Sequence, residues 1–333
     1  MKRAPAHAGS LRLTERLAFV MMFTAMAAFV VGLSVLAAKT GAGSGLPLLE
    51  SSAGTEPVGS GQRPIQPCPS STNVVASRAT ATRPARPSAG LNRRLAAALG
   101  AALGGNRAHL SAGVVDTATG AEAWYHASAH YRAAGVAGAD ILAALLYQHQ
   151  LYQDHHPRSQ ISAHDYSLAA KMIENGSRTA AASLWQAIGG AAGLVRANRA
   201  LGLRHTVPGT GNAWHQTRTT VADQLQLLAS LATTRSALDQ VCRHYELSLM
   251  GHVAVSQRWG VPAAASQDTS YAVNDGWQAE SRRFVVNSVG VIDHGGHEML
   301  VVVLSRNWIT RAAGISAVRA AAKAAVHAMP RSP

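Results

Sequence analysis

No phosphate-binding loop, no dinucleotide fingerprint and no internal repeat occurs in this 333-residue chain. The sequence therefore gives no indication of a nucleotide-binding or repeat architecture, and we expect no cofactor. Acidic residues are few, 17 against 30 lysines and arginines, and the formal net charge is +13. Such an excess in a cytoplasmic protein would suggest nucleic acid. The topology predicted below removes that partner, so we expect no nucleic-acid binding.

Charge is absent from residues 17–38, a stretch of 22 residues near the amino terminus. As a helix it would be roughly 33 Å long, enough to cross a hydrocarbon core of about 30 Å. Basic residues precede this stretch at four positions: Lys2, Arg3, Arg12 and Arg16. They indicate that residues 1–16 stay in the cytoplasm. We therefore predict a single-pass signal anchor in the cell membrane, with the rest of the chain outside the cytoplasm.

A cleaved signal peptide is the alternative interpretation of this stretch. The apolar region of such a peptide has only about 7–15 residues, and no strong small-x-small cleavage site precedes Lys39. No cysteine follows the stretch directly, which argues against a lipid-modified amino terminus. In this alternative the remainder of the chain would be secreted.

Large apolar residues are nearly absent from residues 39–90, which are rich in Gly, Ser, Thr and Pro. Such a segment cannot bury enough surface to offset its ordering entropy, so we expect a disordered spacer. Cys68 lies in this spacer and Cys242 lies in the folded part. Outside the cytoplasm the two can pair and tie the spacer to the domain, or Cys242 can be free and buried. The sequence leaves both possibilities open.

Residues 91–333 have the patterns of a globular domain. Apolar periodicity, Ala-rich runs and β-branched runs predict these elements: helix 91–105, a hairpin around 116–120, helices 140–149, 180–188 and 222–231, strands 283–292 and 298–305, and helix 312–327. This order predicts an α/β (α+β) fold. An antiparallel sheet would be assembled from both ends of the chain and flanked by terminal helices, with an all-helical lobe inserted.

Several segments of this domain occur in an order that resembles one family: 172–190, 202–206, 219–224, 249–253, 257–261, 271–277 and 286–290. They are similar to the landmarks of class A β-lactamases and penicillin-binding, transpeptidase-like serine hydrolases. The resemblance covers residues 91–327 and implies the β-lactamase/transpeptidase-like form of the fold predicted above. It places residues 172–190 around the family's Ser-Asp-Asn loop and residues 271–277 on its active-site strand.

The family's catalytic motifs are missing from the matching positions. Its chemistry depends on Ser-x-x-Lys, Ser-Asp-Asn and Lys-Thr-Gly motifs, and the first places an amine beside a hydroxyl on one helix face. The matching positions here are Gly135 and Gly138 for the first motif, Gly176, Ser177 and Arg178 for the second, and Asn274, Asp275 and Gly276 for the third. Between Thr206 and Thr219 there is no Glu-x-x-x-Asn element either.

These losses predict a catalytically inactive domain, because removing a nucleophile–base unit costs about a millionfold in turnover in a well-studied hydrolase. We expect it to bind a peptidoglycan stem, another cell-wall ligand or an envelope protein. The alternative is an active serine hydrolase, a β-lactamase or a peptidase-like enzyme, with a non-standard centre. Ser177 would be its shifted nucleophile, but no lysine or histidine stands at a spacing that would supply a base. We also predict that Arg178 and Asp275 approach each other across the old cleft.

Other chemistry-bearing residues carry weaker signals. His294 and His297 follow Asp293 and flank two glycines, and neither they nor the pair His155–His156 have a cysteine nearby, so we interpret them as exposed turns and expect no metal. We expect three tryptophans to be aromatic residues of the core or of the cleft wall: Trp185, Trp259 and Trp277.

Overall fold

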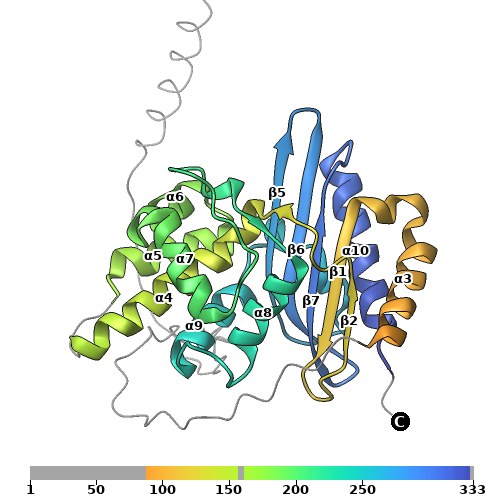
Figure 1. The fold of residues 1–333 in the computed structure, drawn as a ribbon, viewed down its shortest axis with the longest axis horizontal. Helices are drawn as coiled ribbons and strands as arrows, with labels where there is room; N and C mark the ends of the chain where they lie inside the picture. The colour runs from red at the N-terminus through yellow and green to blue at the C-terminus, as the bar shows by residue number, and fades with distance from the viewer. Residues whose placement is uncertain (1–87, 157–160, 331–333) are drawn as a thin grey trace, which may run out of the picture. The chain divides into compact units, whose positions relative to one another are not determined.

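The computed structural model describes residues 88–156 and 161–330 (Figure 1). The predicted anchor at 17–38, nearly all of the predicted spacer at 39–90 and Cys68 lie outside the described residues. Within the described part of the chain, no helix is long and apolar enough to cross a membrane. The topology therefore stays a prediction.

A five-stranded antiparallel sheet is built from both ends of the domain, as predicted. Its strands lie in the order β2-β1-β7-β6-β5, which places β5 at one edge. Their bounds are β1 Leu110–Asp116, β2 Glu122–Tyr125, β5 Tyr271–Glu280, β6 Arg283–His294 and β7 His297–Ser305. A second, two-stranded pairing joins β3 (Tyr131–Arg132) to β4 (Arg218–Thr219).

Two terminal helices, α3 (Ala89–Leu103) and α10 (Arg311–His327), lie on one side of the sheet in Figure 1. On the other side lies the helical lobe, whose helices are α4 Ala137–His155, α5 Ala163–Asn175, α6 Arg178–Ala187, α7 Gly190–Leu201, α8 Val221–Ala232 and α9 Gln240–Gly251. Short 3-10 turns complete the domain: η1 Gly104–His109, η2 Ala134–Val136, η3 Trp214–Gln216, η4 Val255–Gln257 and η5 Val261–Ala264. The predicted layout of sheet, terminal helices and inserted lobe is confirmed.

Local sequence explains where the elements begin and how they pack. Side-chain oxygens of Ser177, Thr220 and Thr310 accept hydrogen bonds from the first-turn amides of α6, α8 and α10, as expected at helix starts. The apolar run of β7 is buried along its length because the sheet is covered on both faces. Gly113 in β1 lets α8 approach the sheet, since a Cβ there would lie 2.6 Å from Val221.

Cys242 is fully buried in α9 and takes part in a disulfide bond. Of the two possibilities that the sequence left open, a free Cys242 is therefore wrong. Cys68, the other cysteine of the sequence, lies outside the described residues. The pairing of these two cysteines stays a prediction.

Candidate functional site

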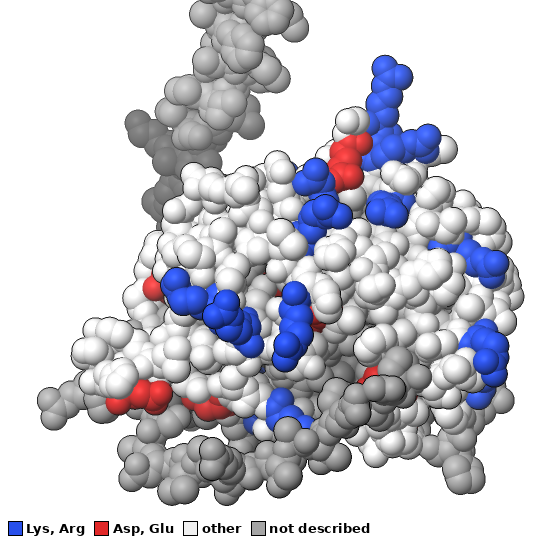
Figure 2. Space-filling view, in the orientation of Figure 1, with Lys and Arg blue, Asp and Glu red and all other residues white. Residues whose placement is uncertain are grey.

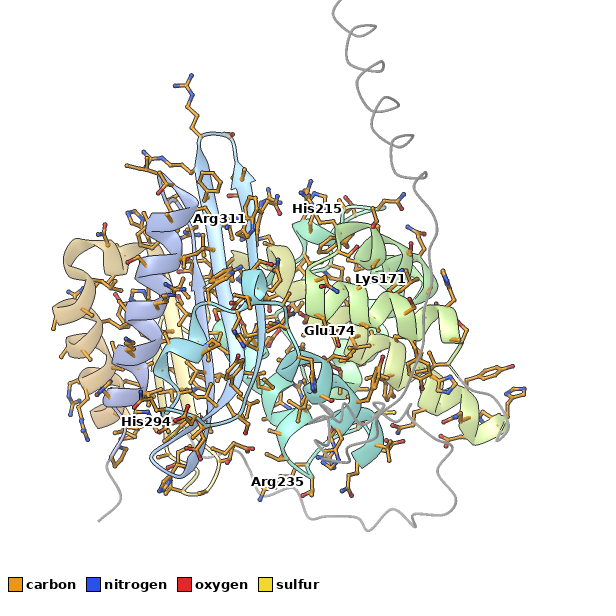
Figure 3. All side chains as sticks on the ribbon, turned by 180° about the vertical axis from the view of Figure 1, so that it is seen from behind. Lys171, Glu174, His215, Arg235, His294 and Arg311 are labelled. Carbon is orange, nitrogen blue, oxygen red and sulfur yellow. The ribbon has the colours of Figure 1, made fainter. Side chains whose placement is uncertain are left out.

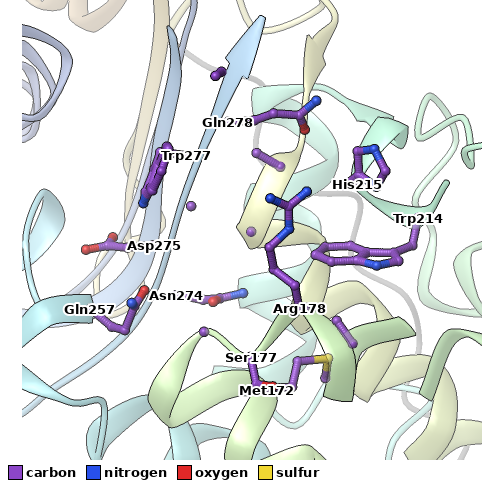
Figure 4. Close-up of a pocket in the computed structure, with 17 residues that line it drawn as sticks. Met172, Ser177, Arg178, Trp214, His215, Gln257, Asn274, Asp275, Trp277 and Gln278 are labelled. Atoms are coloured by element: carbon purple, nitrogen blue, oxygen red, sulfur yellow. The ribbon is translucent and has the colours of Figure 1, made fainter. Parts of the chain in front are cut away.

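A pocket of about 480 Å³ lies where the edge strand β5 meets the helical lobe (Figure 4). All eight positions singled out from the family motifs line it: Gly135, Gly138, Gly176, Ser177, Arg178, Asn274, Asp275 and Gly276. Residues up to about 140 positions apart in the sequence are thus brought together by the fold. A cavity of this size accommodates a small-molecule or dipeptide-sized ligand.

Backbone contacts close the pocket at the position that matches the family's nucleophile. A Cβ added to Gly135 would lie 2.8 Å from the Gly276 Cα and 2.9 Å from the Asp275 carbonyl oxygen. A Cβ added to Gly276 would lie 2.4 Å from the Gly135 nitrogen. At Gly138 the nearest atoms would be 3.5 Å away, an ordinary contact. Strand β5 therefore packs backbone to backbone on η2, with no room for a side chain at 135 unless one of them moves.

Side-chain amides hold η2 in this place. Asn274 Nδ2 donates to the Val136 carbonyl oxygen at 3.1 Å. Asn287 Nδ2 donates to the carbonyl oxygens of Arg132 at 2.8 Å and Ala133 at 3.0 Å. Asn274, which the resemblance matches to the lysine of the family motif, thus contacts the backbone of η2 through its amide.

The predicted approach of Arg178 and Asp275 is wrong. Consecutive side chains of a strand point to opposite faces, so Asn274 faces the pocket and the Asp275 carboxylate faces away from it (Figure 4). Asp275 Oδ2 accepts a hydrogen bond from the Trp259 amide at 2.8 Å, and Ser288 bonds the same carboxylate. Burial raises the pKa of Asp275 well above its ordinary value, against the effects of these hydrogen bonds and of Arg319.

Ser177 caps the start of α6. Its Oγ accepts from the Ala180 amide at 3.3 Å and lies 3.1 Å from the Thr179 Oγ1. Among the described residues, no lysine or histidine side chain is hydrogen-bonded to it. Gly176, just before it, has a φ of 65°, which lets α5 end and α6 begin within one turn.

The helical wall of the pocket is cationic. Arg178 is the exposed first residue of α6, and in the described part of the chain the ion pairs do not include it. His215 lies beside it on η3, and burial lowers the pKa of His215, assisted by the positive charges of Arg178 and Arg132. Trp214, 6% exposed, completes this wall. The opposite wall presents neutral amides, from Asn274 and Gln278 (Figure 4).

Three further pocket residues were not predicted from the sequence: Trp214, His215 and Gln278. The first two lie in a segment without helical or strand periodicity, so no pattern places them. The alternation along β5, in which 274, 276 and 278 share a face, could have indicated Gln278.

The other candidate residues lie elsewhere. His294, whose ring contacts the Ala264 carbonyl oxygen at 2.9 Å, lies at the end of the domain opposite His215 (Figure 3). The described residues contain no group of three or more Cys, His, Asp or Glu side chains placed to hold a metal. Trp185 is fully buried and Trp259 nearly so, whereas Trp277 is 42% exposed beneath the Arg311 guanidinium.

The chain matches the sequence model of a protein family, the Beta-lactamase enzyme family, over residues 149–329. The chain belongs to this family. No curated protein sequence matches the chain. Among solved structures, it is similar to a class A β-lactamase from Bacteroides cellulosilyticus, with a TM-score of 0.61 and 12% identity over 73% of this chain and 99% of that one.

Two further solved structures share the β-lactamase fold with this chain. A β-lactamase from Chitinophaga pinensis has a TM-score of 0.59 and 13% identity, covering 72% of this chain and 99% of its own. A protein described as PBP-A has a TM-score of 0.59 and 19% identity, covering 74% of this chain and 98% of its own. Identities this low show the fold alone, so the activity of this β-lactamase-family chain has to be argued from its own pocket.

Proposed function

We propose that this member of the β-lactamase family binds a cell-envelope ligand in its cleft and forms no acyl-enzyme. The Gly135–Gly276 backbone contact carries the proposal. Acylation needs a nucleophilic side chain beside a base. The chain has glycine at both matching positions, Gly135 and Gly138, and the first of them has no space for a side chain.

The surrounding residues support the same conclusion. Ser177 is engaged as a helix cap, and Asn274 donates its amide to the backbone of η2. Neither residue supplies a base or a positive charge in place of the missing catalytic groups. The pocket nevertheless remains open beside the closed nucleophile position, with a volume of about 480 Å³. A cleft that has lost its reacting groups and kept its volume is suited to binding without cleavage.

The proposed location rests on the sequence. The uncharged residues 17–38 would anchor the chain in the membrane, and residues 39–90 would extend the domain from it, outside the cytoplasm. A peptidoglycan stem or another cell-wall ligand is the partner that such a position brings within reach.

Labelling with a fluorescent penicillin tests the absence of acylation. The solubilised full-length protein should show no covalent fluorescence, no mass increase with penicillins or cephalosporins, and no turnover of nitrocefin above background. The double variant Gly135→Ser, Gly138→Lys should remain inactive, because Arg178 and Asn274 still replace the proton-shuttling and carboxylate-binding groups. Stoichiometric labelling of the unmodified protein at any serine would establish an active serine hydrolase instead.

A further inference from the structure

Positive charge in the cleft is not balanced by carboxylates. The Asp275 carboxylate faces the opposite side of β5, toward Trp259. Glu280, at the upper end of β5, is ion-paired with Arg132. Arg178 is left as the cation that lines the pocket, and the described ion pairs do not neutralise it. A guanidinium in this setting is available to an anionic group from outside.

The geometry around Arg178 suits such a group. In Figure 4 its side chain rises from α6 into the space between the two walls, between Trp214 and Gln278. A guanidinium can hold a carboxylate or a phosphate through two parallel hydrogen bonds. The amides of Gln278 and Gln257, which also line the pocket, are neutral and can hydrogen-bond the polar remainder of a ligand.

The surroundings add an attractive field. Figure 2 shows basic side chains gathered at the end of the domain from which the β5–β6 hairpin projects. Arg282 and Arg283 are exposed at the tip of this hairpin, and Arg311 is exposed beside it. A cleft approached through a surface on which one sign predominates concentrates ligands of the opposite charge.

We propose that the cleft holds an anionic ligand group, a carboxylate or a phosphate, on its helical wall through Arg178. This inference rests on the proposed function, binding without cleavage, and deepens it. The family motif places a lysine on the strand, where this chain has Asn274. The charge has therefore moved from the sheet wall to the facing wall, and a ligand would lie with its anionic end against α6.

His215 supplies an independent readout. Its pKa is lowered by burial and by the charges of Arg178 and Arg132. An anion bound at Arg178 would offset that repulsion, so the pKa of His215 should rise when the ligand is present. A ligand bound elsewhere would leave it unchanged.

Calorimetric titration of the full-length protein tests the proposal with three probes: N-acetyl-D-alanyl-D-alanine, its C-terminal amide and inorganic phosphate. The acid should bind at least about tenfold more tightly than the amide, and phosphate should compete with it, because a hydrogen bond to a charged group is worth about that much. Arg178→Gln should reduce binding of the acid to the level of the amide. Arg199→Gln, an exposed arginine on α7 away from the pocket, is the matched control and should change nothing.

The outcomes separate the inference from the proposed function. The inference would be overturned if acid and amide bind with the same measurable affinity, if Arg178→Gln keeps the wild-type affinity, or if neither the acid nor phosphate binds. Arg178-dependent binding of phosphate alone would support the anion site and assign it to phosphate-bearing ligands. The mass of the protein after each incubation reports on the proposed function, since a covalent adduct would overturn that proposal whatever the affinities. The pKa of His215, followed by NMR with and without the bound anion, must rise if the site is the one proposed.

Discussion

Gly135 and Gly138 are alike in sequence and differ in their surroundings. Gly135 touches the backbone of β5, which cannot retreat without losing its pairing with β6. Gly138, in the first turn of α4, faces the flexible side chains of Met172 and Ile173 at 3.5 Å. The packing therefore requires a glycine at 135, whereas a Cβ at 138 would make only ordinary contacts.

Alanine substitution at these two positions should have opposite effects on stability. Gly135→Ala should lower the free energy of unfolding by about 1–3 kcal/mol, because the added methyl overpacks a backbone contact. Gly138→Ala should raise it by up to about 1 kcal/mol, because alanine favours the helix and no close contact opposes it. Urea denaturation of the two variants beside wild type measures both changes. Equal effects would mean that the contact at 135 yields easily, and the closed nucleophile position would lose its support.

Two carboxyl groups are buried where the helices α4, α8 and α9 pack together, which is unusual for charged residues. Asp140 on α4 is buried and accepts hydrogen bonds from Gln224 on α8 at 3.1 and 3.2 Å. Glu246 on α9 is fully buried, and neither of its carboxyl oxygens has a hydrogen-bond partner in the described structure. Burial raises the pKa of Asp140 to about 7, and burial with repulsion from Asp140 raises the pKa of Glu246 well above its ordinary value.

These raised pKa values predict that the helical lobe is less stable at high pH. Unfolded aspartate has a pKa of about 3.9. Between that pH and about 7 the folded chain keeps a proton on Asp140 that the unfolded chain releases, so stability falls as the pH rises through this range. Asp140→Asn should remove part of the decline, about 1–3 kcal/mol between pH 5 and pH 8 in unfolding experiments.

Asp154→Asn, at an exposed position near the end of the same helix, is the control for this change and should follow the wild-type pH profile. A profile for Asp140→Asn that is parallel to wild type would show that Asp140 is already ionised in the folded lobe.

Sequence patterns sufficed for the elements that obey simple periodicity. Alternating and β-branched runs predicted β1, β6 and β7, and alanine-rich or leucine-striped segments predicted α3, α8 and α10. The first helix of the domain, α3, begins at Ala89, two residues before the predicted domain boundary at residue 91. The eight motif positions lie elsewhere, on η2, α4, β5 and the junction of α5 and α6. The resemblance to the family, not periodicity, is what assigned them to one site.

What the sequence could not provide was the direction and environment of single side chains. Alternation places Asp275 on the face of β5 opposite Asn274, but which of these faces meets the pocket depends on the strand's register against β6 and on Trp259, which approaches from another segment. Burial of Asp140 and Glu246 could not be predicted, because charged residues are usually exposed. Trp214 and His215 lie in an irregular connection whose path is decided by tertiary contacts, such as the bridge between Val207 and Arg218.

For the whole molecule, the predicted anchor would determine the compartment and the membrane at which the cleft is placed. Residues 17–38 carry no charge, and the full-length protein should therefore remain in the membrane fraction after a high-salt wash. The high-salt wash is the relevant control for a chain with a net charge of +13, because salt releases proteins that are held at the membrane by charge alone. Recovery of a soluble form that begins near Lys39 would show that the segment is a cleaved signal and that the domain is secreted.

We predict a disulfide between Cys68 and Cys242, and this disulfide would determine how far the domain can extend from the membrane. Cys242 is disulfide-bonded and the sequence holds one other cysteine, so we expect the bridge to join the spacer to α9. The free spacer would then be residues 39–68 instead of 39–90, and its root-mean-square span would fall from about 40 Å to about 30 Å. After denaturation without reductant, alkylation should label neither cysteine, and peptide mapping should recover one cross-linked pair that separates on reduction. Two labelled thiols in protein isolated from its native compartment would rule out the bridge and leave the cleft its longer reach.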